Sequence, residues 1–410
     1  MLTNFQIHPV SFIKAMSKAL ELSSNGISKH HRRTAIISRY IGMKLGINQN
    51  QLQVLIYASL LHDIGAAANW DEKHFIVHTD NDNLVFNHAE AGYRILKESA
   101  RLGILAEPIR YHHDRFCGGN PSGFVGTEIP LLSRIIHVAD RIEVQIDDSQ
   151  HIFRQRDKII SDLQENAFFD PEIIKVIRDM SKIDAFWLDI VNIDYVNNFI
   201  NTLSFFEKLL FDLNDMISIA EIFAKVVDAT SPFTATHSKN VAKVCKELAR
   251  IIGFSEQEVD QFYLAGLLHD LGKLAIPNKI LDKRGRLDND EYEIVKQHPY
   301  YSYRIMEEVD GFQTIASWAG THHERLDGSG YPFKLASAQI SFGSRMLAVA
   351  DIYCALIEAR PYRDGMTIEE ALEVINEMVL EMKIDANIVD VLRQNAKLLY
   401  TLIARKELIS

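Results

Sequence analysis

The stretch Leu267-Leu268-His269-Asp270-Leu271-Gly272-Lys273 decides the fold. It predicts the end of a buried helix that presents a histidine and a carboxylate side by side. Adjacent helical residues point roughly 100° apart, which suits two groups that hold one metal cluster and is poor geometry for a hydrogen bond between them. A histidine–aspartate pair that occurs by itself is more often a core histidine beside a local aspartate. This pair is accompanied by further polar residues in apolar, helix-patterned segments, namely His237, His298, His322, His323 and Asp351.

The same pattern occurs earlier in the chain. The segment 58–63 matches 265–270 at an offset of 207 residues, which also places His30 on His237. At slightly larger offsets, further pairs follow in the same order: His88 on His298, His112 on His322, His113 on His323 and Asp140 on Asp351. Ordered recurrence of this kind predicts a tandem duplication of one domain.

Helical periodicity dominates both copies, and strand signals are sparse. In the first copy the pattern predicts helices over 11–22, 30–44 and 51–61, with Gly46 ending the second. We therefore expect an all-α fold of two tandem domains, residues 1–200 and 205–410. The apolar segment 198–216 lacks Pro and Gly, so we expect it to be a continuous helical connection.

Composition excludes several classes of partner. The formal net charge of −11 argues against a nucleic-acid polymer, whereas a small anionic ligand needs only a few local cations. The three cysteines form no Cys-x-x-Cys pair, which argues against a disulfide framework and favours a reducing compartment. We see no signal-peptide pattern and no apolar run of membrane-spanning length, so we expect a cytoplasmic protein without a membrane partner.

The second copy offers more ligands than one metal ion can use. Five imidazoles and two carboxylates recur in order: His237, His269, Asp270, His298, His322, His323 and Asp351. Nitrogen and oxygen ligands suit Fe, Mn, Zn, Co or Ni and disfavour metals that prefer thiolates. Two metal ions bridged by one aspartate is the economical solution, and such a pair suits hydrolysis at a phosphoryl centre. No Walker loop is present, so nucleotide-driven phosphoryl transfer is not favoured.

Beyond these residues, the second copy resembles an HD-GYP domain, a branch of the HD metal-dependent phosphohydrolase superfamily. The resemblance covers residues 215–395 and rests on four motifs: His269 to Lys273, His298-Pro299, His322 to Pro332, and Val349-Ala350-Asp351 followed by Arg360-Pro361-Tyr362-Arg363. It implies a bacterial phosphodiesterase that hydrolyses a cyclic dinucleotide, cyclic di-GMP or 3′3′-cyclic GMP-AMP, to a linear dinucleotide, and it leaves open whether hydrolysis continues to mononucleotides.

The resemblance also implies roles for individual residues. His237, His269, Asp270 and Asp351 would hold the first of two divalent ions, with Fe or Mn favoured and Zn, Co or Ni as alternatives. Asp270 would bridge to a second ion on His298, His322 and His323. Asp270 and Lys273 are the predicted catalytic residues. The predicted substrate contacts are Lys273, Gly330, Tyr331, Arg360 and Arg363.

Two positions depart from the family pattern. Members with a third metal resemble one another in carrying Glu four residues before the first histidine, where this chain has Phe233, so we expect a two-metal site. The family usually has Asp three residues after the last ligand, where this chain has Cys354. That change puts one substrate-facing or outer contact in doubt, and a small buried residue is the favoured interpretation of the cysteine.

The first copy resembles a degenerate HD domain. It keeps the ligand row, as His30, His62, Asp63, His88, His112, His113 and Asp140. Ala66 replaces the lysine, no Gly-Tyr-Pro turn follows the histidine pair, and no Arg-Pro-Tyr-Arg follows Asp140. Three interpretations stay open: a regulatory half that binds metal without turnover, a hydrolase for another phosphoester, and a metal-free half.

We therefore predict an enzyme, a cyclic-dinucleotide phosphodiesterase whose activity resides in the second copy. The alternative is a non-hydrolytic signalling module that binds a cyclic dinucleotide. Lys273 and the intact Gly330-Tyr331-Pro332 argue against the alternative. The preferred cyclic dinucleotide, the metal, homodimer formation and signalling-protein partners stay open at this stage.

Overall fold

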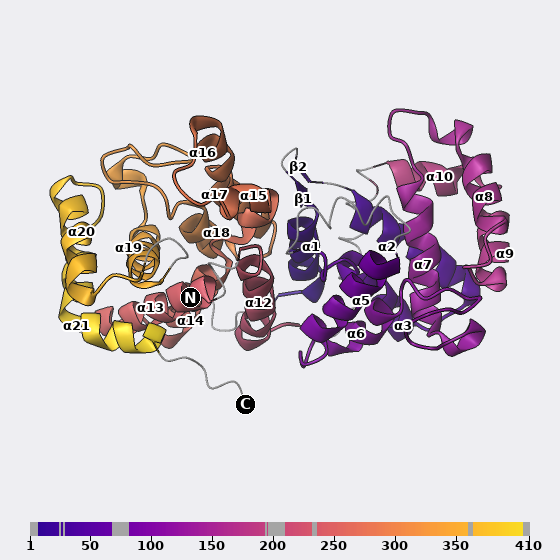
Figure 1. The fold of residues 1–410 in the computed structure, drawn as a ribbon, viewed down its shortest axis with the longest axis horizontal. Coiled ribbons are helices and arrows are strands. Elements are labelled where there is room, and N and C mark those ends of the chain that lie inside the picture. The colour runs from indigo at the N-terminus through magenta and orange to yellow at the C-terminus, as the bar shows by residue number, and fades with distance from the viewer. Residues whose placement is uncertain are drawn as a thin grey trace. The chain divides into compact units, whose positions relative to one another are not determined.

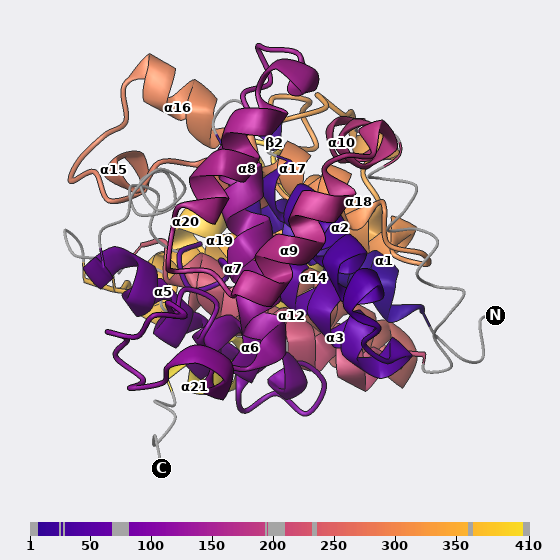
Figure 2. The ribbon, with the colours of Figure 1, turned by 90° about the vertical axis from the view of Figure 1, so that its right-hand side faces the viewer.

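The fold was obtained as a computed structural model, which describes residues 7–23, 26–27, 29–67, 82–192, 195, 210–231, 236–359 and 364–404. The chain divides into two compact units. One contains residues 8–22 and 27–210, and the other contains residues 1–7, 23–26 and 211–410. Both are built from helices (Figures 1 and 2), so the all-α prediction is confirmed.

The amino-terminal half carries the indigo to magenta elements of Figure 1. They are α1 Pro9–Leu20, β1 Leu22–Ser23, β2 Gly26–Ile27, α2 His30–Leu45, α3 Gln49–Leu61, α5 Asp82–Leu96, η1 Gly103–Leu105, α6 Ala106–Arg110, η2 Gly126–Glu128, α7 Leu131–Val144, η3 Ile152–Arg154, α8 Arg156–Gln164, α9 Pro171–Met180 and α10 Asp184–Val191. The two short strands pair with each other. Helix α2 packs on α3 and α7.

The carboxy-terminal half repeats this arrangement. Its elements are α12 Leu213–Asp228, α13 His237–Ile252, α14 Glu256–Leu268, η5 Leu271–Ala275, α15 Asn278–Leu281, α16 Asn289–Val295, α17 His298–Met306, α18 Gln313–Gly320, η6 Ser337–Gln339, α19 Phe342–Ile357, α20 Ile368–Leu380 and α21 Ala386–Ala404. Helix α13 packs on α14 and α19, as α2 packs on α3 and α7 in the other half.

Local sequence explains why equivalent helices begin and end at equivalent residues. Gly46 and Gly253 end α2 and α13 in the left-handed conformation, which a glycine adopts without steric cost. Asn48 and Ser255 then start α3 and α14 with capping boxes. These helix–turn–helix pairs carry the first two ligand positions of each row.

Two expectations about element boundaries were wrong. The helix predicted over 11–22 is observed as α1 over Pro9–Leu20. It starts earlier because Pro9 occupies its first turn, and it ends earlier because Leu22 belongs to β1. The predicted helical connection over 198–216 is not continuous. Residues 196–209 lie outside the described residues, Phe211 forms an antiparallel bridge with Ile7, and Asp212 caps the start of α12. The Asp212 side chain accepts a hydrogen bond from the Asp215 amide, which favours a helix start at this point.

No helix in the described ranges combines the length and the apolar character that crossing a bilayer requires.

Candidate metal centre

The structure brings the seven residues of the carboxy-terminal row together around one buried point. They come from the start of α13, the end of α14, the start of α17, the end of α18 and the middle of α19. Six of them are buried and one, His323, is half-buried. Sets of their ligand atoms lie within 4.8 Å of one another: His237 with His269 and Asp351, His269 with Asp270 and His322, and His298 with His322 and His323.

Asp270 lies between the two parts of the cluster. Its Oδ2 atom is 3.2 Å from His269 Nε2, and its Oδ1 atom is 3.2 Å from His298 Nε2. On the first side, Asp351 Oδ1 lies 3.1 Å from His237 Nε2 and 3.9 Å from His269 Nε2. A carboxylate with one oxygen toward each side is the arrangement that a bridging ligand needs.

The histidines present lone pairs to this point. The Nδ1 atoms of His269, His298 and His322 lie 2.5–2.7 Å from main-chain carbonyl oxygens, so Nδ1 must donate and Nε2 must carry the lone pair. Among the described residues, these three buried Nε2 atoms make no hydrogen bond of acceptable geometry, although those of His269 and His298 lie 3.2 Å from Asp270 oxygens, which are acceptors as well. A buried polar atom without a partner is costly, and coordination of a divalent ion would satisfy all three. The donor set therefore fits a transition metal.

The burial and the contacts of the cluster also shift the pKa values of its histidines and of Asp270. Burial lowers the pKa of His323 to about 3, and burial together with His323 holds the pKa of His322 well below its usual range. Burial also lowers the pKa of His237, but hydrogen bonds to Asp351 and Glu358 outweigh it and raise that pKa to about 10. Although burial raises the pKa of Asp270, His269 and Lys273 hold it well below its usual range. At neutral pH the cluster thus combines neutral imidazoles at His322 and His323 with a protonated His237 and an ionised Asp270.

The packing of η5 on α17 requires a glycine at position 272, two residues after Asp270. A Cβ atom at this position would lie 2.0 Å from the carbonyl oxygen of His298. Its amide donates to Ser302 Oγ at 2.9 Å. This close approach lets η5 pack on α17 and brings Asp270 to His298. Gly65 is equivalent in the amino-terminal half, where a Cβ would lie 2.0 Å from the carbonyl oxygen of His88.

Lys273 contacts the cluster directly. Its Nζ atom lies 2.5 Å from Asp270 Oδ2, and the side chain is one-fifth exposed. Burial lowers the pKa of this ammonium, but Asp270 outweighs it and raises that pKa. A permanent positive charge therefore lies at the edge of the cluster. Ala66, its counterpart, is buried and supplies no charge.

The Gly-Tyr-Pro turn lies against the second part of the cluster. The ring of Tyr331 is 4.9 Å from that of His323, and the Tyr331 amide donates to the His323 carbonyl. A Cβ at Gly330 would lie 2.4 Å from the Glu324 Cα atom, so only glycine fits there. A cavity of about 410 Å³ adjoins the turn and is lined by Glu293, Lys296, Gln297, Tyr300, Tyr301, Tyr331, Pro332 and Lys334. Arg360, Arg363 and Phe233 lie outside the described residues.

Sequence reasoning missed the carboxylates that orient the first histidine of each row. Glu358, at the end of α19, lies 2.7 Å from His237 Nδ1, and Glu143 lies 2.5 Å from His30 Nδ1. Glu143 occupies the position equivalent to Cys354, three residues after the last ligand. The loss of a carboxylate at Cys354 was the available signal, but Glu358 lies one helical turn further on and matches no motif. Cys354 itself is fully buried, and burial raises its pKa.

The amino-terminal row forms an equivalent cluster. Asp63 Oδ1 is 3.3 Å from His88 Nε2, and Asp63 Oδ2 is 3.3 Å from both His30 and His62. Asp140 Oδ1 lies 3.3 Å from His30 Nε2. His88 Nε2 is 3.3 Å from His112 and 3.2 Å from His113. One further histidine, His31, which the sequence comparison did not include, joins His30, His62 and Asp63 in this cluster.

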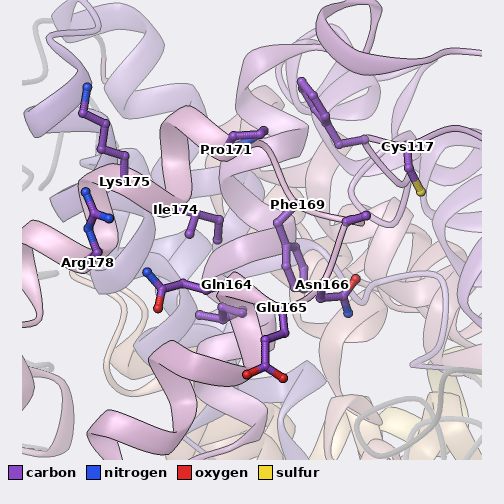
Figure 3. Close-up of a pocket in the computed structure, with 12 residues that line it drawn as sticks. Cys117, Gln164, Glu165, Asn166, Phe169, Pro171, Ile174, Lys175 and Arg178 are labelled. Carbon is purple, nitrogen blue, oxygen red and sulfur yellow. The ribbon is translucent and has the colours of Figure 1, made fainter.

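The amino-terminal half also contains a cavity of about 560 Å³ that is separate from its ligand row. It is lined by Phe116, Cys117, Leu163, Gln164, Glu165, Asn166, Ala167, Phe169, Pro171, Ile174, Lys175 and Arg178. Figure 3 shows these side chains, with Lys175 and Arg178 on the same helix, α9. No residue of the cluster lines this cavity, so we do not assign the candidate site to it.

Comparison with known proteins places the chain in a family. A family model described as "HD domain" matches residues 14–173 and 221–388. The 3′3′-cGAMP-specific phosphodiesterase 1 of Vibrio cholerae is 29% identical over 94% of this chain and 91% of its own length. A cyclic di-GMP phosphodiesterase response regulator of Xanthomonas campestris is 35% identical over 42% of this chain and 47% of its own length.

A crystal structure supports the same relationship. The structure of a cyclic GMP-AMP-specific phosphodiesterase of V. cholerae matches with a TM-score of 0.67 and 26% identity, over 96% of this chain and 98% of that one. As the sequence motifs predicted, the chain belongs to the HD domain family.

Proposed function

We propose that the carboxy-terminal half is a metal-dependent phosphodiesterase that opens the ring of 3′3′-cyclic GMP-AMP. The observation that carries this proposal is the buried cluster in which the Nε2 atoms of His269, His298 and His322 converge near Asp270, with Lys273 at its edge. Relatives that align along both halves are named as cyclic GMP-AMP-specific phosphodiesterases. The cyclic di-GMP enzyme aligns over less than half of the chain, which makes cyclic di-GMP the second candidate substrate.

The proposed ligands form two sets, one for each divalent ion. His237, His269, Asp270 and Asp351 would hold one divalent ion, and Asp270, His298, His322 and His323 would hold a second. Divalent ions in such a site stabilise the negative charge that develops on the phosphoryl oxygens. We favour Fe or Mn, because the donors are imidazoles and carboxylates without a thiolate.

The remaining residues would position the substrate. The Lys273 ammonium lies beside Asp270, where it can pair with an oxygen of the scissile phosphate. Tyr331 presents an aromatic face next to His323, which suits stacking by a nucleobase. Arg360 and Arg363 are the proposed partners of the second phosphate, because a guanidinium matches phosphate oxygens bidentately.

The test uses the internal repeat as its control. The full-length protein, stripped of metal and reloaded with Mn(II) or Fe(II), is assayed with 3′3′-cyclic GMP-AMP, cyclic di-GMP and cyclic di-AMP. We expect turnover of 3′3′-cyclic GMP-AMP to be lost in His269→Ala/Asp270→Ala and kept in His62→Ala/Asp63→Ala, which makes the same change in the other half. Turnover that survives the first double substitution would exclude this site as its source.

Binding without turnover would instead support the signalling module. Product release over hours, set against binding measured by calorimetry, separates the two functions. The same assay measures whether hydrolysis continues past the linear dinucleotide.

A further inference from the structure

The two halves differ at one residue of an otherwise equivalent helix start. Helices α2 and α13 both begin with a ligand histidine, and the next residue is His31 in one half and Ser238 in the other. In both halves an acidic residue binds the amide of this second residue. Glu21 accepts from His31 N at 2.6 Å, and Asp228 accepts from Ser238 N at 3.2 Å. The main chain is thus held in the same way, and the side chain is what changes.

The side chains at this position make different contacts in the two halves. Ser238 donates its hydroxyl to Asp228 at 2.7 Å, so its side chain is engaged by the same carboxylate that accepts from its amide. His31 instead is buried and places Nε2 3.4 Å from Asp63 Oδ2. Its ring also lies edge-on to that of His62, with centroids 5.0 Å apart. His31 therefore faces the ligand atoms of the amino-terminal row.

His31 takes the place that Lys273 has in the other half. In each half, Oδ1 of the central aspartate faces the second part of the cluster, 3.3 Å from His88 and 3.2 Å from His298. Oδ2 faces the first part. In the carboxy-terminal half Oδ2 contacts the lysine ammonium, whereas in the amino-terminal half the lysine is Ala66 and Oδ2 contacts His31. Oδ2 of the central aspartate thus contacts an ammonium in one half and an imidazole in the other.

The amino-terminal cluster has lone pairs that face one another. His62 and His112 each use Nδ1 to donate to a main-chain carbonyl, so their Nε2 atoms carry lone pairs. His62 Nε2 lies 3.1 Å from His30 Nε2, whose Nδ1 is engaged by Glu143, and His112 Nε2 lies 3.3 Å from His88 Nε2. Two Nε2 lone pairs at this distance repel each other in a buried site, and a metal ion between the nitrogens would satisfy both.

We infer that the amino-terminal half holds a metal ion in a closed site, in which His31 fills the coordination position that a water or substrate would need. His30, His31, His62 and Asp63 offer three imidazole nitrogens and one carboxylate oxygen within 4.8 Å of one another. Four protein ligands are typical of closed structural sites, whereas hydrolytic sites keep a position open. The amino-terminal ion would stabilise this half and would not hydrolyse a phosphoester. The inference does not depend on the proposed function of the other half.

The test measures metal content and water access in the full-length chain. The starting protein carries His269→Ala and Asp270→Ala, which disable the carboxy-terminal cluster, and the probe is Mn(II). After desalting, bound Mn(II) is quantified, and the relaxation rate of water protons reports how much water reaches each bound ion. We expect this protein to retain Mn(II) with a smaller relaxation enhancement per bound ion than the carboxy-terminal cluster gives in the His62→Ala/Asp63→Ala protein, because an ion with more protein ligands keeps fewer waters.

His31→Ser, which copies the residue of the other half, is the decisive variant. We expect it to bind Mn(II) roughly tenfold more weakly and to raise the relaxation enhancement per bound ion, because a water takes the vacated position. His31→Asn is made alongside, so that a folding defect in one variant, detected by circular dichroism, leaves the other to decide. His151→Ala is the matched control, because His151 is an exposed histidine outside the cluster.

Three results would overturn the inference. The starting protein could fail to retain Mn(II), which would make the half metal-free. It could retain Mn(II) with high relaxation enhancement, which would make the site open. His31→Ser could match His151→Ala in both readouts, which would remove His31 from the ligands. None of these readouts uses turnover, so they are distinguishable from a failure of the proposed phosphodiesterase activity.

Discussion

Four of the five imidazoles of the carboxy-terminal cluster are oriented through their Nδ1 atoms. Main-chain carbonyl oxygens three residues earlier in the sequence hold the rings of His269, His298 and His322, whereas a carboxylate, Glu358, holds His237. Such outer partners fix the tautomer and the direction of the metal-binding nitrogen.

Lys273→Ala is expected to lower kcat by roughly 10²–10³, because it removes the ammonium that we propose stabilises the oxygens of the scissile phosphate. The bound metal content should stay unchanged, since lysine is not a ligand. Steady-state kinetics measures kcat, and elemental analysis measures the bound metal content. Lys283→Ala is the control, because its ammonium pairs with Glu291 instead of the cluster. Equal kcat values for the two variants would contradict the role of Lys273.

Glu358→Gln is expected to weaken metal binding by roughly 10–100-fold, because it removes the carboxylate that orients His237. Adding Cys354→Glu should restore part of the affinity, since it moves the carboxylate to the position that Glu143 occupies in the other half. Calorimetric titration with Mn(II) measures both effects. A wild-type affinity in the single variant would show that Glu358 is structural only.

Metal binding is expected to become tighter as the pH rises. His237, whose pKa is raised to about 10, holds a proton at neutral pH that a metal ion must displace. The apparent affinity for Mn(II) should therefore rise by about tenfold per pH unit for each displaced proton until His237 is deprotonated. Titrations at pH 6, 7 and 8 at constant ionic strength measure this slope. An affinity independent of pH would contradict the protonated state of His237.

At the scale of elements, the helix–turn–helix pairs and the short helix after each His-Asp pair carry the geometry. Their caps were readable in advance, since Gly46, Gly253, Asn48 and Ser255 have strong positional preferences. The break at Phe211 was not readable, because its apolar neighbours have helical spacing while its backbone pairs with Ile7. Pairing between segments far apart in sequence overrides local periodicity.

Gly272→Ala tests the contact between η5 and α17. The new methyl group would lie 2.0 Å from the His298 carbonyl oxygen, so we expect a loss of about 1–3 kcal/mol in the free energy of unfolding, together with weaker metal binding. Gly65→Ala creates the same clash in the other half and should leave the carboxy-terminal metal affinity unchanged. Thermal unfolding and Mn(II) titration measure these effects. A Gly272→Ala protein with normal metal affinity would contradict this account of the glycine.

At the scale of the whole molecule, the duplication made the ligand row predictable. A histidine or aspartate that recurs in order in both copies stands out from single buried histidines, and the structure places both rows in buried clusters. His31 could not be found in this way, because the aligned residue of the other copy is Ser238. Glu358 could not be found either, because the corresponding carboxylate, Glu143, aligns with Cys354. The sequence repeat identifies the ligand residues that the two halves share, and the structure identifies the residues in which they differ.

The central claim is that the carboxy-terminal cluster holds the ions that hydrolyse the cyclic dinucleotide. Anomalous diffraction from crystals grown with Mn(II) tests it most directly. The account predicts anomalous peaks on both sides of Asp270, one beside His237, His269 and Asp351 and one beside His298, His322 and His323. Crystals that show no peak at this cluster, while Mn(II) supports turnover in solution, would contradict it.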